Sequence, residues 1–263
     1  MQDFSSAPSN SGCKDQAREQ AADTAAKGRF AVVIPAYNHG GSVRTVALGA
    51  QKSGLPVFVV DDGSSDDTFE QVTGLSGVHV LRHEKNRGKG AALCTGFEKA
   101  RQTADWAVTL DADGQHDPEH IDTLVRAAQA AAQVSGRVIV VGRRTGMDNA
   151  NVHWTSRFGR GFSNFWVSIC GGPRITDSQS GFRIYPLPDV LNWGIRARRF
   201  EFEVEALVLA RRHGVPVIEV PVAVHYLPPH ERISHFRPWM DFLRNARTFS
   251  RLLTRRLLSS FGG

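Results

Sequence analysis

The stretch Trp106-Ala107-Val108-Thr109-Leu110-Asp111-Ala112-Asp113-Gly114-Gln115 decides the fold. A mainly apolar run passes directly into two acids, a glycine and an amide. A second apolar run, residues 57–60, ends in the same way at Asp61 and Asp62. Short runs of this kind are typical of buried strands, and a carboxylate at the end of such a strand is costly unless it meets a cation, a donor or a ligand. We therefore expect two buried strands that each end in acids.

Strand-like and helix-like segments alternate on both sides of these two runs. The expected strands are 30–34, 57–60, 78–81, 106–110 and 138–141. The expected helices are 42–53, 68–75, 90–102 and 118–134, the last with Asp117 as its N-cap and Pro118 at its first position. This alternation predicts an α/β fold: a mostly parallel central sheet with helices on both faces and ligands at the carboxyl ends of the strands.

The rest of the chain is less regular. Segments 156–169 and 203–213 have helical patterns, and 215–224 reads as an edge strand because Pro216 and Pro221 interrupt it. Helical periodicity returns over 231–258. We expect a mobile N-terminal tail over 1–27, a single α/β domain over 28–229 and a basic amphipathic helical region over 230–263.

Composition narrows the class of protein. The chain has 263 residues, of which 41% are hydrophobic and 22% charged, and these proportions exclude a mainly disordered protein. Its three cysteines have no zinc-like spacing and are expected to be free thiols in a reducing compartment. The sequence has neither a membrane-spanning apolar run nor the apolar core of a signal peptide, so we expect a cytoplasmic protein.

The net charge of +6 admits three kinds of partner: nucleic acid, an anionic membrane surface or phosphorylated small molecules. Residues 231–263 contain seven arginines and two acids, so most of the excess lies in this segment. No nucleic-acid-binding motif occurs, and the arginines do not alternate with aromatic residues that could stack on bases. A membrane surface and phosphorylated molecules are therefore the expected partners.

The acids after residue 110 are arranged as metal ligands could be. In extended backbone Asp111, Asp113 and Gln115 project to one side, because side-chain direction alternates. Oxygen ligands of this kind suit Mg²⁺ or Mn²⁺ that shares its coordination shell with diphosphate oxygens. The other interpretation is a turn in which Asp and Gly cap backbone groups, and for Asp61 to Ser65 that interpretation is equally open.

A third segment could also meet an anion. Asn86-Arg87-Gly88-Lys89-Gly90 opens a helix and could present backbone N–H groups to a phosphate, or its glycines could simply shape a tight turn. It is neither a P-loop nor a dinucleotide-binding fingerprint. No GxSxG or HExxH motif occurs, which removes the commonest hydrolase and metalloprotease interpretations.

In combination these motifs resemble the family 2 glycosyltransferases of the Rossmann-like GT-A fold, and within them the dolichyl- and polyprenyl-phosphate hexose synthases. The resemblance covers roughly residues 29–245. It is carried by four ordered segments and a later one: Ile34-Pro35-Ala36-Tyr37-Asn38, Val60-Asp61-Asp62-Gly63-Ser64-Ser65-Asp66, Asn86-Arg87-Gly88-Lys89-Gly90-Ala91, Asp111-Ala112-Asp113-Gly114-Gln115-His116 and Thr176-Asp177-Ser178-Gln179-Ser180-Gly181-Phe182-Arg183.

The resemblance implies a binding site for a nucleoside diphosphate sugar and a divalent ion. The residues it assigns to the donor are Pro35, Ala36, Tyr37, His39, Asp61, Asp62, Lys89, Asp111, Ala112, Asp113 and Gln115. Among these, Asp111, Asp113 and Gln115 would bind Mg²⁺ or Mn²⁺ at the diphosphate, and Asp62 would hold the base or ribose. His39 stands where the family usually has Glu, so it is either a base contact or an exposed loop residue.

The resemblance also implies an acceptor phosphate held by arginines. Arg143, Arg157 and Arg232 match the family best, and Ser234 and His235 stand where it usually has Ser-Lys. A polyprenyl phosphate is already anionic near neutral pH, since the second pKa of a phosphomonoester is about 6. Such an acceptor needs no dedicated general base, unlike a sugar hydroxyl.

Two acidic segments are harder to assign from sequence. Asp177 could act directly in catalysis, position the sugar or shape its loop. Glu201, Glu203 and Glu205 alternate with Phe202 and Val204. This pattern could be a strand that leads into a helix with one face toward the sugar, but we favour the interpretation as solvated acids.

The C-terminal region has a basic amphipathic pattern. From Phe236 to Leu257 apolar residues recur every three or four positions, with arginines between them. The pattern fits either a helix packed on the domain with solvated arginines, or a surface helix that contacts anionic lipid.

We expect transfer of one hexose from a GDP-mannose or UDP-glucose type of donor to polyprenyl phosphate, dependent on metal and with inversion at the anomeric carbon. Asp113, Asp177, Arg157 and Arg232 are the residues expected to carry the reaction, on the cytoplasmic face of a membrane. A family 2 transferase for a hydroxyl acceptor, with Asp177 as base, is the alternative. A non-catalytic nucleotide-sugar-binding module is the second alternative. The sequence does not indicate the oligomeric state.

Overall fold

The computed structural model of the chain describes residues 28–145, 154–225, 244, 246–254 and 256, with backbone alone for 154–159. The predicted tail, 1–27, and most of the predicted C-terminal region lie outside the described residues. The strands are β1 (Phe30–Ala36), β2 (Val57–Asp61), β3 (Val78–Arg82), β4 (Trp106–Thr109), β5 (Ile139–Arg144), β6 (Arg183–Pro186) and β7 (Val217–Val222). The helices are α2 (Val43–Gln51), α3 (Thr68–Val72), α4 (Lys89–Ala100), α5 (Ile121–Ser135), α6 (Trp154–Ile169), α7 (Asp189–Asn192) and α8 (Glu201–Arg212), with the short 3-10 helix η1 (Pro118–His120) before α5.

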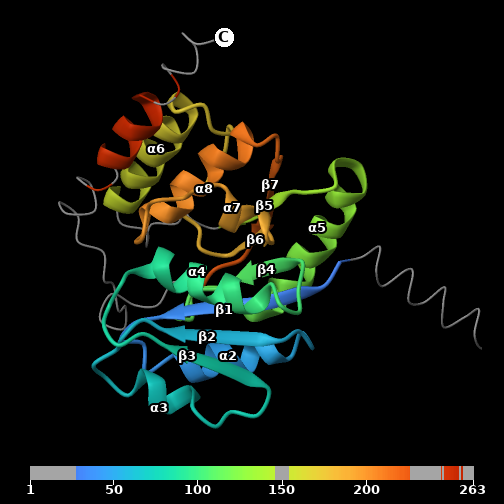
Figure 1. Cartoon of the computed structure of the whole chain (residues 1–263), viewed down its shortest axis with the longest axis vertical. Coiled ribbons are helices and arrows are strands. Elements are labelled where there is room, and N and C mark those ends of the chain that lie inside the picture. The colour runs from blue at the N-terminus through green and yellow to red at the C-terminus, as the bar shows by residue number, and fades with distance from the viewer. Residues whose placement is uncertain (1–27, 146–153, 226–243, 245, 255, 257–263) are drawn as a thin grey trace, which may run out of the picture.

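A single sheet of seven strands organises these elements (Figure 1), in the order β3-β2-β1-β4-β6-β5-β7. β1 pairs in parallel with both β2 and β4. The chain therefore moves outward from β1 to β2 and β3, then crosses back to β4 on the other side of β1. Open α/β sheets bind ligands at such a reversal, outside the carboxyl ends of the strands. The predicted mostly parallel sheet is confirmed.

Helices cover both faces of the sheet because the central strands alternate their side chains between two cores. In β1, Ala31 and Val33 face a core built with α4, α6, α7 and α8. Phe30, Val32 and Ile34 face the opposite core, built with α2, α3 and α5. This period of two is the normal geometry of a strand, and in β1 it buries every residue. The loops of the candidate site are therefore anchored to a central sheet that is packed on both faces.

The sequence missed β6, which is the one element that breaks the parallel pattern. It runs antiparallel between β4 and β5. Its four residues, Arg183 to Pro186, are all buried, but a run of this length with a buried arginine gives little strand signal. The guanidinium of Arg183 donates to the backbone oxygens of Ser180, Ser178 and Glu203. These bonds satisfy a charge that would otherwise be costly to bury.

The predicted edge strand and helix start are confirmed. β7 pairs only with β5 among the described strands and stands at the end of the sheet. Pro221 is accommodated there because an edge strand has a side without ladder hydrogen bonds. The Asp117 carboxylate caps η1 by accepting from the backbone N–H of Glu119 at 2.9 Å.

The described C-terminal residues pack on the domain. Residues 246–254 are helical, and Phe249 stacks on Trp166 of α6 with ring centroids 5.8 Å apart. Leu252 is fully buried, and Arg251 forms an ion pair of 2.7 Å with Glu205 of α8. The apolar side chains of Phe249 and Leu252 are therefore used in the protein core. Of the two interpretations of this pattern, packing on the domain describes these residues.

No helix in the described ranges combines the length and the apolar character needed to cross a membrane.

Candidate active site

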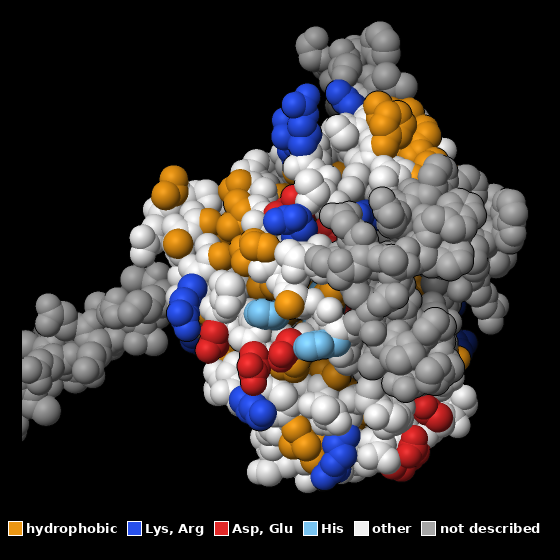
Figure 2. Space-filling model, turned by 180° about the vertical axis from the view of Figure 1, so that it is seen from behind, with side chains coloured by type: hydrophobic (Ala, Val, Ile, Leu, Met, Phe, Trp, Pro, Cys, Tyr) orange, Lys and Arg blue, Asp and Glu red, His pale blue; other side chains and the backbone are white. Residues whose placement is uncertain are grey.

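The site lies where β1, β2 and β4 end. Ala36 at the end of β1 stands level with Asp61 at the end of β2, and Asp111 follows β4 by two residues. Acidic and histidine side chains lie near one another in the middle of one face of the molecule (Figure 2). The expectation that the two acidic segments follow strands is confirmed.

The loop after β1 is tied to the loop after β2. Asn38 has a positive φ of 53°, which asparagine tolerates better than most residues. Its side-chain oxygen accepts from the backbone N–H of Ser65 at 2.8 Å, and its own N–H donates to Ser64 Oγ at 2.9 Å. The N–H of His39 donates to Thr68 Oγ1 at 2.7 Å. These bonds fix the loop that carries Tyr37 and His39, directly after Pro35 and Ala36 at the end of β1.

Asp61 and Asp62 are both buried and hold loops together. Asp61 pairs with the guanidinium of Arg82 at 3.0 Å. Asp62 accepts three hydrogen bonds: from His83 Nδ1 at 2.6 Å and from the backbone N–H groups of Arg87 and Gly88 at 2.9 and 2.7 Å. The carboxylate of Asp62 therefore fixes the loop that leads into α4 and Lys89. A contact of Asp62 with a base or ribose stays a prediction.

A cluster of charges stands at the centre of the site. Lys89, the first residue of α4, places its Nζ 2.6 Å from Asp111 Oδ1 and 2.7 Å from Glu203 Oε1. Asp111 comes from the end of β4 and Glu203 from the first turn of α8. Three elements that are distant in sequence thus meet at one ammonium group. The sequence predicted Lys89 and Asp111 here, but not Glu203.

The interpretation of Glu203 and Glu205 as solvated acids is wrong. Both side chains are buried. Glu203 faces Lys89, and Glu205 accepts from the backbone N–H groups of Arg196 and Ala197 at 3.1 and 2.8 Å. Helical rather than extended backbone explains the error, because in a helix the alternation of acids and apolar residues does not separate two faces. The buried acids are stabilised by the cations and N–H groups that they meet.

Burial and charge shift the pKa values of this cluster in different directions. Burial alone would raise the pKa of Asp111, but the Lys89 ammonium outweighs it and holds that pKa below its usual value. Burial would lower the pKa of Lys89, but Asp111 and Glu203 raise it above normal. Lys89 is therefore a fixed positive charge at the site. Its charge offsets those of the Asp111 and Glu203 carboxylates at the carboxyl edge of the sheet.

Asp113 stands in a different environment from Asp111. Burial, followed by repulsion from Asp111, raises the pKa of Asp113 to about 6. Its carboxylate accepts from the backbone N–H and the side-chain amide of Gln115, both at 3.0 Å. Gln115 therefore orients Asp113 in this arrangement. Two neighbouring acids of which one resists ionisation form a site that gains free energy when a cation approaches.

These residues fit a divalent ion that also contacts the substrate. Asp111 and Asp113 supply hard carboxylate oxygens, and among the described side chains no group of three or more His, Cys, Asp or Glu converges as a complete metal cage. Mg²⁺ and Mn²⁺ sites with one or two carboxylates complete their shell with substrate phosphates and water. The donor set thus suits an ion that arrives with a diphosphate.

Gly181 gives Asp111 the room that it occupies. A Cβ atom built on Gly181 would lie 2.2 Å from Asp111 Oδ2 and 2.6 Å from its Oδ1. The hydroxyl of Thr109 donates to the Gly181 carbonyl at 2.7 Å and holds the two segments together. The SGF segment thus meets the Asp-x-Asp segment directly, and glycine is required for that approach.

Asp177 is held by Arg144, the last residue of β5. Its carboxylate accepts two hydrogen bonds of 2.8 Å from the guanidinium of Arg144 and one of 3.1 Å from the Arg144 N–H. Asp177 is fully buried. Burial would raise its pKa, but Arg144 holds that pKa below the usual value. A carboxylate bound in this bidentate manner is a weak base, so a positioning role fits the geometry best.

The structure describes only part of the predicted acceptor site. Arg143 is the last residue but one of β5, next to Arg144, and is half-buried. Arg157 lies in α6, but its side chain falls outside the described residues, as do Arg232, Ser234 and His235 entirely. Their roles stay predictions.

His116 is a further residue that sequence reasoning missed. It is buried and packs on Phe182, with ring centroids 5.3 Å apart. Burial lowers its pKa to about 4, so at neutral pH it is an uncharged part of the wall behind Asp111.

Residues 31–187 match the family model described as glycosyl transferase family 2. The chain belongs to this family. It is 32% identical over 216 residues to the UDP-N-acetylglucosamine–dolichyl-phosphate N-acetylglucosaminyltransferase of Methanococcus voltae, covering 74% of this chain and 85% of that protein. It is 30% identical over 208 residues to the undecaprenyl-phosphate mannosyltransferase of Micrococcus luteus, covering 74% of this chain and 82% of that protein. The predicted resemblance is confirmed.

Solved structures show the same fold at low identity. Mannosyl-3-phosphoglycerate synthase of Rubrobacter xylanophilus has a TM-score of 0.63 at 15% identity, over 94% of this chain and 77% of that one. Glucosyl-3-phosphoglycerate synthase of Mycobacterium tuberculosis, solved with Mn²⁺ and UDP-glucose, has a TM-score of 0.61 at 20% identity, over 88% of this chain and 80% of that one. At these identities the likeness establishes the GT-A fold of this glycosyltransferase and nothing finer.

Proposed function

We propose that this glycosyltransferase transfers one hexose from a nucleoside diphosphate sugar to a polyprenyl phosphate. The observation that carries the proposal is the meeting of Asp111, Asp113 and Lys89 where the order of the sheet reverses. Such a group of two acids and a lysine suits a diphosphate with its metal ion. The named relatives from Methanococcus and Micrococcus support the acceptor class, because both names contain a polyprenyl-type phosphate.

The donor diphosphate would bind at the carboxyl edge of the sheet. Asp111 and Asp113, with Gln115 beside them, would hold Mg²⁺ or Mn²⁺, and when bound the ion neutralises charge that builds up on the departing diphosphate. The Mn²⁺ and UDP-glucose held by the structural relative from Mycobacterium are consistent with this assignment. Lys89 adds a fixed positive charge. Pro35 and Ala36 at the end of β1, with Tyr37 and His39 in the loop after it, would face the nucleoside.

The acceptor would attack without a base. A phosphate oxygen forms the new bond to the anomeric carbon while the bond from that carbon to the diphosphate oxygen breaks, with inversion. The nucleophile is already an anion at neutral pH, so no proton has to be removed. Arg143, Arg157 and Arg232, with Ser234 and His235, are the residues proposed to bind the acceptor phosphate. Guanidinium groups suit this task because they donate two parallel hydrogen bonds.

The proposed acceptor is a lipid, so we propose that the enzyme works at a membrane surface, on its cytoplasmic face. The basic excess of residues 231–263 supports contact with anionic lipid.

A screen of labelled nucleotide sugars with polyprenyl phosphate, with and without Mn²⁺, tests the proposed function. We expect a labelled lipid that forms only with the ion and that mild acid hydrolyses, because a glycosyl phosphate is acid-labile. A product stable to mild acid, formed on a hydroxyl-bearing glycolipid or glycan, would favour the alternative with Asp177 as base. Donor binding without transfer to any acceptor would favour a binding module.

A further inference from the structure

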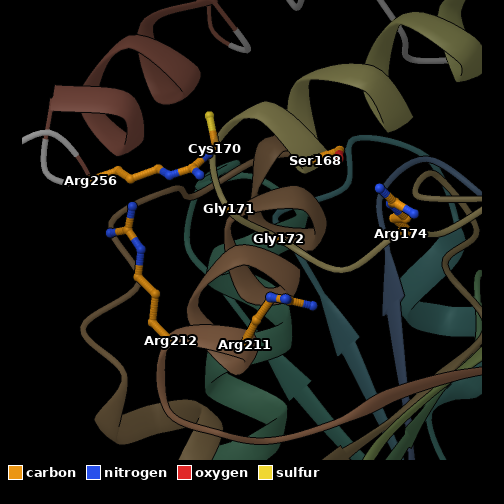
Figure 3. Close-up of a pocket in the computed structure, with 8 residues that line it drawn as sticks. All are labelled: Ser168, Cys170, Gly171, Gly172, Arg174, Arg211, Arg212 and Arg256. Atoms are coloured by element: carbon orange, nitrogen blue, oxygen red, sulfur yellow. The ribbon is translucent and has the colours of Figure 1, made fainter. Parts of the chain in front are cut away.

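A hollow lined by arginines lies away from the carboxylate cluster. Its volume is about 940 Å³, and its walls come from the end of α6, the segment after it, the end of α8 and the C-terminal helix. Figure 3 shows the side chains of Arg174, Arg211, Arg212 and Arg256 around the turn formed by Gly171 and Gly172. None of the eight lining residues is acidic.

The hollow and the active site lie at opposite ends of α8. Glu203 in the first turn of α8 faces Lys89, whereas Arg211 and Arg212 are in the last turn. Arg212 lies nine positions after Glu203 in this helix, and at 1.5 Å per residue this corresponds to about 13 Å along the axis. The hollow is therefore a separate feature, and the proposed donor and acceptor residues that the structure describes do not line it.

Two of the four arginines donate hydrogen bonds to carbonyl groups near the ends of helices. Arg212 donates to the carbonyl of Leu252 at 2.7 Å, and Arg256 donates to the carbonyl of Ile169 at the end of α6. Cations are favourable near the carbonyl end of a helix. Within the described ranges, the side chains of Arg174 and Arg211 form no ion pair and no hydrogen bond to a carbonyl group. Four like charges around one hollow repel one another, and an anion placed among them would remove that repulsion.

Apolar side chains stand beside the hollow. Phe165 and Ile169 are four residues apart on α6 and are exposed by 57% and 39%. Residues with this spacing lie on the same face of a helix, and Ile169 directly precedes Cys170, which lines the hollow. Figure 2 shows hydrophobic and basic side chains near one another at the end of the molecule where Figure 1 places α6. Apolar groups beside cations are typical of a surface that meets lipid head groups.

We propose that this hollow binds the phosphate of an anionic lipid head group, with Phe165 and Ile169 in contact with the adjoining apolar layer. The guanidinium groups match a phosphate better than ammonium groups would, because their paired N–H groups can donate to two of its oxygens. The inference rests on the proposed function only in expecting a membrane near the enzyme. The lipid at this site is not the acceptor: it holds the enzyme on the surface that carries the acceptor.

Flotation of the full chain with vesicles tests the site without nucleotide sugar or polyprenyl phosphate. The vesicles contain phosphatidylcholine alone or phosphatidylcholine with phosphatidic acid. The variant Arg174→Gln with Arg211→Gln removes two charges from the hollow. A basic residue near an anionic surface contributes about 1 kcal/mol, a factor of about five, so the variant should bind the anionic vesicles about twentyfold less well or worse.

A matched variant controls for net charge. Lys52→Gln with Arg126→Gln removes two exposed cations, one directly after α2 and one on α5, and it should retain most of the binding. Phe165→Ser with Ile169→Ser should weaken binding to the anionic vesicles while every charge is kept. All six of these side chains are exposed, and a thermal melt of each variant confirms folding.

Three results would overturn the proposal. The first is equal loss of binding in the two charge variants. The second is failure of the unmodified chain to prefer anionic vesicles. The third is binding of glycerol phosphate in solution that depends on Arg174 and Arg211 while vesicle binding does not, which would assign the hollow to a soluble phosphate. The flotation experiment measures no hexose transfer. The proposed lipid site can therefore be wrong while the proposed function is right, and the proposed function can be wrong while the lipid site is right.

Discussion

Lys89 balances the charges of the active site. It is within 2.7 Å of acids from two other elements, Asp111 and Glu203. The sequence indicated Lys89 and Asp111 because each belongs to a short segment with its own pattern. Glu203 could not be predicted in the same way, since its partner is set by how α8 docks on α4. The sequence shows that Glu201, Glu203 and Glu205 alternate with apolar residues, but this pattern predicts solvated rather than buried acids.

Glu203→Gln tests whether this acid tunes the proposed metal site. With Glu203 neutral, Lys89 pairs with Asp111 alone. It then competes more strongly with the divalent ion for the Asp111 carboxylate. A charged hydrogen bond is worth about 1.5 to 3 kcal/mol, so we expect the Mn²⁺ concentration for half-maximal transfer to rise about tenfold or more.

Glu201→Gln is the matched control, because Glu201 opens the same helix and is only half-buried. It should leave the Mn²⁺ requirement unchanged. If Glu203→Gln lowers the melting temperature and leaves the Mn²⁺ requirement as it was, the role of Glu203 is structural only.

Asp177→Asn should destabilise the fold at neutral pH. It would leave the guanidinium of Arg144 without its buried partner, which typically costs about 3 kcal/mol or more. The pKa of Asp177 is lowered in the folded state, so its stabilising contribution is full above the unfolded pKa of about 4 and is lost as the pH falls through the lower folded pKa. Urea unfolding at pH 7 and at successively lower pH below 4 measures this.

Asp105→Asn is the control for that experiment, since Asp105 pairs with Arg29 at an exposed site. It should cost less than about 1 kcal/mol at neutral pH. A difference between wild type and Asp177→Asn that stays constant from pH 7 into the acid range would contradict the role given to the Asp177 carboxylate.

At the scale of elements, the sequence predicted the parallel half of the sheet and missed the antiparallel strand. β1, β2 and β4 consist almost wholly of apolar residues because both of their faces are covered, and such runs are visible in a sequence. β6 has as few residues as β4, but a buried arginine interrupts its apolar pattern. Arg183 donates to backbone oxygens that include the one of Glu203 in α8, and the sequence carries no local signal for this contact.

Gly181→Ala tests the contact between the segment before β6 and the end of β4. The added methyl group would overlap the carboxylate of Asp111 and displace it. Displacement of a catalytic group by about 1 Å can cost a factor of about 100 in rate, and we expect a fall in kcat of that order.

Gly161→Ala is its control, because a Cβ at Gly161 of α6 meets no atom within 4 Å. Its kcat should equal that of wild type. If Gly181→Ala is folded and its kcat is unchanged, the observed position of the Asp111 carboxylate is not needed for the reaction.

At the scale of the whole molecule, the basic charge of the chain is unevenly distributed. Much of it lies in residues 231–263, and the described residues of this segment pack on α6 and α8 through Phe249 and Leu252. Sequence periodicity alone could not distinguish this packing from a lipid-facing helix, because both need an apolar stripe with cations between. Arg256 joins this segment to the arginine-lined hollow, which connects the charge distribution to the proposed membrane contact.

The central claim is that the acids at the reversal of the sheet act on a metal-bound diphosphate. The most direct test is the rate of Mn²⁺-dependent hexose transfer to polyprenyl phosphate by Asp113→Ala, compared with Asp122→Ala, which removes an exposed acid from α5. We expect Asp113→Ala to lose transfer at every Mn²⁺ concentration while Asp122→Ala keeps the wild-type rate. Transfer by Asp113→Ala at the wild-type rate and with the same Mn²⁺ dependence would contradict the claim.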